Sequence, residues 1–204
     1  MKHPSSRALF AYWDAQRGLR AAPERADIDP AAIRHVLADT FVLAADFAGA
    51  SRFRLAGTKV CSLFMRELKD QPFLGLWSEA SRTSMQELTE IVEQETLGVV
   101  AGASGVTAQG DAIELELLLL PLSRRGHARV RAIGVLAPLT LPYWLGSHPV
   151  QELRLGARRH VGRGVDGGIE APLTAPPPGG RPRRRFVVYE GGRGHADREP
   201  AAAS

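Results

Sequence analysis

Short runs of alternating apolar and polar residues predict five β-strands. In the fourth run, the odd-numbered positions from Ile113 to Leu119 are all apolar, as expected for side chains that share one sheet face. Glycines separate neighbouring runs at Gly49, Gly110 and Gly126, where hairpin turns are expected. The predicted strands are residues 40–46, 52–56, 98–107, 112–120 and 128–137.

Two helices are predicted before the first strand. Leu9, Tyr12 and Trp13 recur at helical spacing and give a short amphipathic helix that Gly18 can end. Residues 29–37 begin with an aspartate and a proline, which are favoured at the N-cap and the first helical position, and they predict a second helix.

Two more helices are expected between the second and third strands. Thr58 is placed to cap a short helix with the apolar face Val60, Leu63 and Phe64. Ser78 opens a longer amphipathic helix that reaches almost to the third strand. This order of strands and helices indicates an α+β fold, with the middle helices on one face of the sheet.

The other face of the predicted sheet changes from charged to apolar along its strands. In the fourth strand Glu114 and Glu116, arranged as a solvated rim, precede Leu118 and Leu120, and the fifth strand follows the same pattern. An apolar patch of this kind is normally covered, by the N-terminal helix or by a partner protomer. The candidate interaction residues are Leu9, Tyr12, Trp13, Leu118, Leu120, Ile133 and Val135.

The net positive charge belongs to the C-terminal part of the chain. Residues 1–155 carry 17 basic and 17 acidic side chains, whereas residues 156–204 carry nine arginines and five acidic residues. Residues 142–204 lack regular periodicity and contain a proline-rich stretch beside the arginine cluster 181–185. We therefore predict an irregular, disordered basic tail, and the high pI does not indicate a basic folded surface.

Four segments resemble the single-domain PAS family of alphaproteobacteria. They are, in order, Trp13-Asp14-Ala15-Gln16-Arg17-Gly18, Asp29-Pro30-Ala31-Ala32-Ile33, Phe53-Arg54-Leu55-Ala56-Gly57-Thr58 and Leu120-Pro121-Leu122. The likeness implies a PAS fold, with a five-stranded antiparallel sheet, helices on one face and an N-terminal helix. It divides the chain into a helix and connector (1–28), a PAS domain (29–141) and the tail (142–204), and it implies sensing or docking.

A PAS fold also implies a cavity between the middle helices and the sheet, although the same residues can make a closed core. Arg54 has two interpretations, as an anchor for an anionic group or as the partner of Asp46 on the neighbouring strand. The candidate lining residues are Arg54, Val60, Cys61, Phe64, Phe73, Leu88 and Leu117.

The sequence contains few residues arranged for catalysis or metal binding. Cys61 is the only cysteine, which excludes an intrachain disulfide, and no two histidines stand at the spacing of a helical metal site. The helix at 78–95 lacks histidine, which argues against a His-ligated haem, and no Asn-Cys-Arg-Phe-Leu-Gln-like motif supports covalent flavin photochemistry. We assign no catalytic or metal-binding residues, and the ligand is unknown.

These features predict a non-enzymatic PAS sensory and interaction module that acts in trans on a regulatory protein, with or without a small ligand. A homodimer is also compatible with them. The alternative is a nucleic-acid-associated regulator acting through the basic tail, which has weak support because no aromatic residues alternate with the arginines. Neither a signal-peptide core nor an apolar stretch of about 20 residues is present, so we expect no membrane span and a cytoplasmic location.

Overall fold

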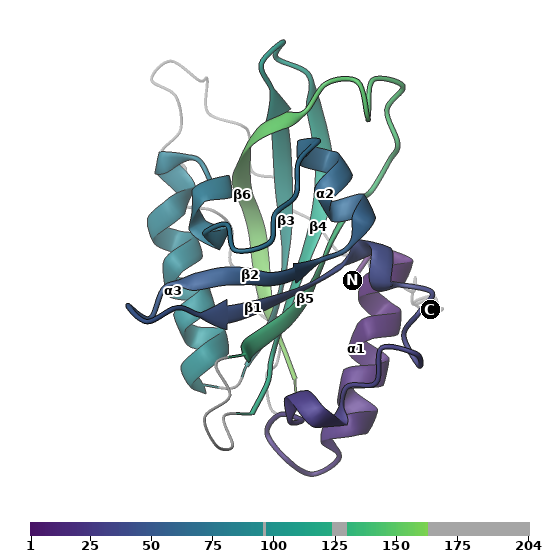
Figure 1. Cartoon of the computed structure of the whole chain (residues 1–204), viewed down its shortest axis with the longest axis vertical. Coiled ribbons are helices and arrows are strands. Elements are labelled where there is room, and N and C mark those ends of the chain that lie inside the picture. The colour runs from purple at the N-terminus through teal and green to yellow at the C-terminus, as the bar shows by residue number, and fades with distance from the viewer. Residues whose placement is uncertain (96, 124–129, 163–204) are drawn as a thin grey trace, which may run out of the picture. The chain divides into compact units, whose positions relative to one another are not determined.

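The computed structural model describes residues 1–95, 97–123 and 130–162, and its centre is one six-stranded sheet (Figure 1). The strands lie in the order β2-β1-β5-β4-β3-β6, and every neighbouring pair is antiparallel. They are β1 Thr40–Ala45, β2 Ser51–Ala56, β3 Gly98–Thr107, β4 Ala112–Pro121, β5 Val130–Pro138 and β6 Val150–Val161.

Helices cover both faces of this sheet (Figure 1). The segments between β2 and β3 pack on one face, and the first helix packs on the other. None of the helices in the described residues is long and apolar enough to cross a membrane. The helices are α1 Pro4–Arg17, α2 Thr58–Phe64 and α3 Glu79–Glu95, with 3₁₀ turns η1 Arg25–Asp27, η2 Leu37–Asp39 and η3 Phe73–Leu76.

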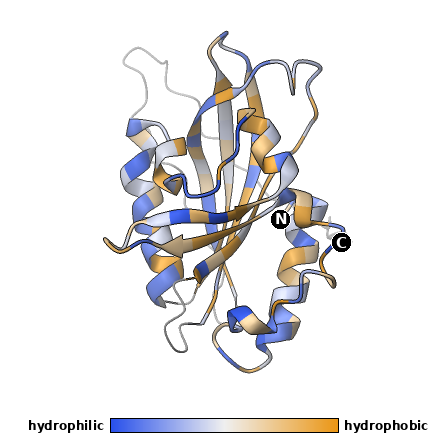
Figure 2. Cartoon of the chain, in the orientation of Figure 1, coloured by the Kyte–Doolittle hydropathy of each residue, from blue (hydrophilic) through white to orange (hydrophobic). Residues whose placement is uncertain are grey.

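The core under α2 and α3 is built around four aromatic rings. Phe73 lies at the centre, and its ring centroid is 5.6 Å from that of Phe53, 5.8 Å from that of Phe41 and 6.0 Å from that of Trp77. The odd-numbered apolar residues of β4 face this core, as the alternation predicts. Figure 2 shows the contrast between the apolar central strands and the partly hydrophilic ribbon of α3.

A second core lies between α1 and the opposite face of the sheet. Leu9 and Trp13 are fully buried there, and Leu118, Ile133 and other apolar strand residues of the same sheet face pack around them. The prediction that the N-terminal helix covers this face is confirmed.

The prediction of five strands is wrong, because residues 150–161 form a sixth. This strand, β6, pairs with β3 along its length and lies in the segment that was expected to be irregular. The register of β6 against β3 shifts between Ala101 and Ala103, where Gly156 comes close to Gly102. This shift breaks the alternation of apolar and polar residues along β6, which is the sequence signal of a strand. Residues 142–149 form turns before this strand, whereas residues 163–204 of the predicted tail, including its arginine cluster, lie outside the described residues, as does the turn expected at Gly126.

The second predicted helix is also absent, since residues 30–36 form turns that lead into η2. The carboxylate of Asp29 accepts a hydrogen bond from the backbone N–H of Ala31 at 2.9 Å, which stabilises a local turn. Ile33 is nevertheless buried, as its apolar spacing suggested. At α2 the N-cap is Gly57, so Thr58 is the first helical residue and not the cap.

Candidate functional site

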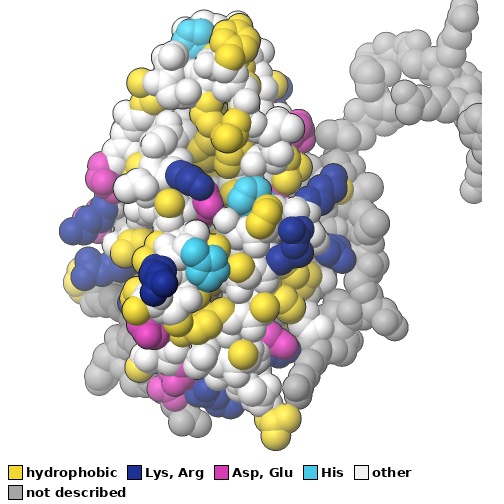
Figure 3. Space-filling view, turned by 90° about the vertical axis from the view of Figure 1, so that its right-hand side faces the viewer, with side chains coloured by type: hydrophobic (Ala, Val, Ile, Leu, Met, Phe, Trp, Pro, Cys, Tyr) yellow, Lys and Arg dark blue, Asp and Glu magenta, His cyan; other side chains and the backbone are white. Residues whose placement is uncertain are grey.

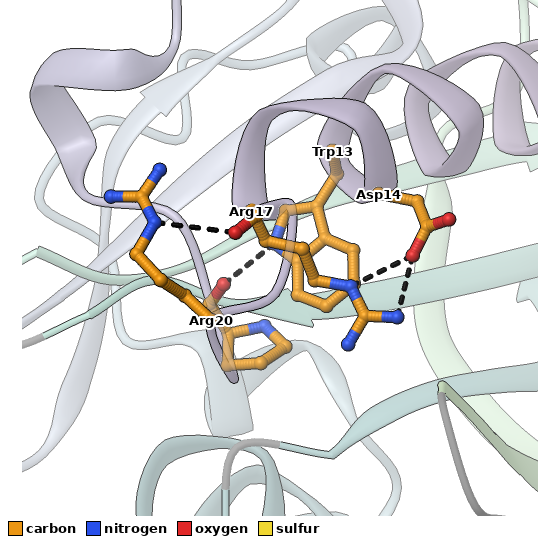
Figure 4. A network of polar contacts seen from close by, with 5 residues as sticks. Trp13, Asp14, Arg17 and Arg20 are labelled. Carbon is orange, nitrogen blue, oxygen red and sulfur yellow. Dashed lines mark hydrogen bonds and ion pairs between the residues drawn. The ribbon is translucent and has the colours of Figure 1, made fainter.

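The four segments that carry the family resemblance meet in two pairs. In the first pair, the indole Nε1 of Trp13 donates a hydrogen bond to the carbonyl oxygen of Pro121 at 2.8 Å (Figure 4). The guanidinium of Arg17 lies 4.8 Å from the Trp13 ring centroid and donates to the carboxylate of Asp14. This pair fixes α1 on the sheet.

In the second pair, residues 29–33 lie beside residues 53–58. Both segments line a surface pocket of about 330 Å³. The turn after β2 is held close to η2, because the N–H of Gly57 donates to the carbonyl oxygen of Thr40 at 2.8 Å. A Cβ at position 57 would lie 2.6 Å from the carbonyl carbon of Ala38, so a side chain does not fit there.

Strand β2 contains a bulge at Arg54. Val42 pairs with Leu55 and Leu43 pairs with Phe53, which leaves Arg54 and Leu55 together opposite one residue. Both side chains are exposed, and both line a pocket of about 470 Å³. A regular strand period of two would place Arg54 and Leu55 on opposite faces of the sheet, and the bulge interrupts that period.

Arg54 is also not the partner of Asp46. The carboxylate of Asp46 accepts a hydrogen bond from Arg52 Nε at 2.8 Å. This bond, with the backbone N–H of Ala50, holds the pKa of Asp46 below its usual range. Arg54 has no hydrogen bond or ion pair with another residue in the described part of the chain, so its guanidinium is free to bind an anionic group.

The two pockets share Arg25, Val42, Leu55 and Ala56 and therefore form one groove beside an edge strand, which we call the β2 groove. Its floor and walls are mainly apolar, and its charged lining consists of Arg25, Arg54, Lys69 and Glu67. The remaining lining residues are Ile28, Pro30, Ile33, Leu37, Ala38, Thr40, Val42, Leu55, Ala56, Gly57, Thr58, Val130 and Ile133.

A sequence model of the PAS domain family matches residues 1–137. The chain belongs to the PAS domain family. A crystal structure of the PAS domain of a protein from Colwellia psychrerythraea is similar at 15% identity and a TM-score of 0.38, with 54% of this chain and 97% of that chain covered. No curated protein matches the chain.

Within this PAS domain, the predicted cavity residues do not form one site. Five of them pack in the core under α2 and α3, where their exposed fractions are 0–4%. Cys61 is half-buried beside that core, and Arg54 lies outside it in the β2 groove. The five buried residues are Val60, Phe64, Phe73, Leu88 and Leu117, and their packing matches the closed-core interpretation.

The thiol of Cys61 lies 3.6 Å from Oε1 of Glu67, a residue that lines the β2 groove. Burial raises the pKa of Cys61, and the nearby negative charge of Glu67 raises it further. The backbone N–H of Lys69 and the Cys61 thiol both donate to Glu67 and lower the pKa of that carboxyl. Cys61 is therefore a protonated thiol at neutral pH and a weak nucleophile.

The predicted interaction residues pack inside the chain. Six of them are buried in the core beneath α1. The seventh, Tyr12, is half-buried, and its hydroxyl donates to the carbonyl oxygen of Asp27 at 3.2 Å and accepts from the N–H of Asp29 at 2.8 Å. These residues hold α1 and its connector on the sheet, and Ile133 also lines the β2 groove.

Glu116 was predicted to lie on a solvated rim, but it is 5% exposed. Its carboxylate accepts hydrogen bonds from the backbone N–H groups of Lys2 at 2.5 Å and His3 at 2.9 Å. Burial alone would raise the pKa of Glu116, but these bonds outweigh it and hold the pKa below its usual range. The leucines that follow Glu116 on the same strand face were the available signal that this position is covered.

A further pocket of about 590 Å³ lies between the start of α1, α2 and the segment after β5. Its most buried polar residue is Asp39, which accepts a hydrogen bond from Ser5 Oγ at 2.7 Å and lies 3.5 Å from Lys59 Nζ. The lining residues are His3, Pro4, Asp39, Lys59, Ser62, Leu63, Pro138, Leu139, Thr140, Leu141 and Leu145. The volume is within the range of small-molecule sites.

Proposed function

We propose that this PAS domain is a non-enzymatic sensory and interaction module that acts in trans by binding a regulatory protein partner in the β2 groove. Membership of the PAS family supports a sensory or signalling role in general. The observation that carries the proposal is the convergence of two family-like segments, residues 29–33 and 53–58, on one open apolar groove. An exposed apolar surface bordered by charged groups is typical of a protein-binding site.

The packing of the interior supports docking over turnover. Five of the seven residues expected to line an internal ligand site pack in the core under α2 and α3 instead. Beside the groove residue Glu67, the thiol of Cys61 is held protonated by burial and by that carboxylate, which is the opposite of what a nucleophile requires. A small ligand remains compatible with the proposal, since the pocket beside Asp39 is open to the surface. The alternative of nucleic-acid binding rests on tail residues outside the described part of the chain.

Site-specific photo-crosslinking in cells of the source organism tests the proposal. A photoreactive residue replaces Leu55, which is 48% exposed in the groove, and in a control replaces Phe47, which is 93% exposed in the turn between β1 and β2. We expect Leu55 to give a discrete crosslinked protein that Phe47 does not give. Equal products from both positions, no product from Leu55, or metabolite consumption by the purified chain would contradict the proposal.

A further inference from the structure

We infer that the β2 groove recognises a partner segment in which an apolar side chain lies next to a carboxylate, and that Arg54 binds the carboxylate. This inference rests on the proposed docking function and adds the chemistry of the partner. It follows from three properties of the groove, which are its apolar floor, its excess of positive charge and the geometry of the β2 bulge.

The floor of the groove is suited to an apolar side chain. Val42 and Ile133 lie on neighbouring strands there, and Ile28 and Ile33 form the wall opposite. Leu55 is 48% exposed, although it lies in a strand and borders the buried core beneath α1. An apolar group placed on Leu55 would remove this surface from water, which is favourable in proportion to the area buried.

The charges that line the groove favour an anion over a cation. Arg25, Arg54 and Lys69 provide three positive groups against the single carboxylate of Glu67. That carboxylate is already engaged, because it accepts hydrogen bonds from the backbone N–H groups of Leu68 and Lys69. A basic segment, such as the arginine-rich part of this chain's own tail, would meet net repulsion here.

Arg54 is the cation best placed to bind the carboxylate. The guanidinium of Arg25 donates to the carbonyl oxygen of Ile28 at 3.1 Å, and Lys69 interacts with the charge of Glu67. Arg54 has neither kind of contact within the described residues. A free guanidinium presents a planar set of donors that matches both oxygens of a carboxylate, which a lysine does not.

The bulge makes the apolar and anionic contacts neighbours. In a regular strand, consecutive side chains point to opposite faces, so Arg54 and Leu55 would be separated by the sheet. Because both lie opposite Val42, they line the same pocket. A partner residue that packs on Leu55 therefore brings an adjacent carboxylate to Arg54. Figure 3 shows that hydrophobic and basic side chains are interspersed on the side of the molecule that carries α1.

Selection of a random peptide library on phage against the immobilised full chain tests this inference. We expect the enriched peptides to combine an apolar residue with Asp or Glu. Arg54→Glu should weaken the best synthetic peptide by about tenfold or more, because a hydrogen bond to a charged group contributes about 1.5–3 kcal/mol. Arg54→Gln should weaken it less, and Arg82→Glu on α3, across the sheet, should leave it unchanged.

The inference fails if no peptide is enriched, if the enriched peptides are basic or lack acidic residues, or if Arg54→Glu and Arg54→Gln bind undiminished. Far-UV circular dichroism of each variant identifies any loss of binding caused by misfolding. If Arg54→Glu misfolds, the loss of peptide affinity in Arg54→Gln, a substitution at the same exposed position, decides the test. Crosslinking at Leu55 reports on docking independently. A specific crosslink without an acidic preference would retain the proposed function and reject only the chemistry assigned to the partner.

Discussion

The indole N–H of Trp13 donates to the carbonyl oxygen of Pro121 across the interface between α1 and the end of β4, at a distance of 2.8 Å. The two residues are far apart in the sequence, yet each lies in a segment that carries the family resemblance. The bond is buried, and Arg17 covers the outer face of the indole. One of the two segment pairs therefore attaches α1, and the other leaves a groove.

We expect Trp13→Phe to destabilise the fold more than Trp77→Phe does. Both tryptophans are 0–1% exposed, so the two substitutions remove similar packing. Trp13→Phe also removes the hydrogen bond to the carbonyl oxygen of Pro121, whereas Trp77 Nε1 is buried without an acceptor among the described residues, so Trp77→Phe removes no such bond. The difference should be about 1–2 kcal/mol in the free energy of unfolding, measured with urea. Equal losses would show that the Pro121 bond contributes little.

Gly57→Ala should destabilise the protein strongly, by about 2–4 kcal/mol, because its Cβ would collide with the backbone of Ala38. Gly102→Ala is the matched control, since its Cβ would meet the carbonyl oxygen of Ala157 at 3.8 Å, an ordinary contact distance. Thermal unfolding of both variants compares them directly. A stable Gly57→Ala protein would mean that η2 can move away from the turn after β2.

The contribution of Glu116 to stability should depend on pH. Its pKa is lower in the folded state than in the unfolded state, so the fold stabilises the ionised form. This stabilisation is complete above the ordinary glutamate pKa of about 4.3 and is lost as the pH falls through the folded-state pKa. We expect Glu116→Gln to cost about 1–3 kcal/mol at neutral pH, and the gap from the parent protein to shrink in acid.

Urea unfolding of both proteins from pH 7 down to pH 3 measures that gap. Asp46 and Glu67 also have lowered pKa values, but both proteins retain them, so the difference isolates Glu116. A gap that stays constant with pH would contradict the assigned role.

Cys61 should react slowly with a thiol reagent in the native state, because burial and Glu67 raise its pKa. Glu67→Gln removes the negative charge and should speed labelling modestly at pH 7–8. The urea-unfolded chain sets the rate of the free thiol. Native labelling as fast as that reference would contradict the assignment of Cys61 as a weak nucleophile.

The sequence predicted those parts of the fold that follow a single period. The odd-numbered residues of β4 identified one core, and Leu9 and Trp13 identified the helix over the other face. The short helix after the glycine turn was also predicted, although its N-cap is Gly57 and not Thr58. These signals depend on neighbours along the chain, and local physics is enough to interpret them.

The parts that were missed depend on contacts between distant segments. The bulge at Arg54 exists only relative to the register of β1, and β6 is recognisable by its pairing with β3 more than by its own alternation. Glu116 looked like a solvated residue because its partners, Lys2 and His3, precede it by more than a hundred residues. No local pattern indicates that those backbone groups approach it.

Because of the bulge, β2 contributes side chains to both faces of the sheet in an irregular order. Upstream of it, Phe53 belongs to the aromatic cluster under α2 and α3; downstream, Leu55 borders the layer formed by α1. This short strand thus links the two cores that lie on opposite faces of the sheet. A partner that binds at this edge strand therefore contacts residues next to both cores, so β2 can couple partner binding to the packing on both faces of the sheet.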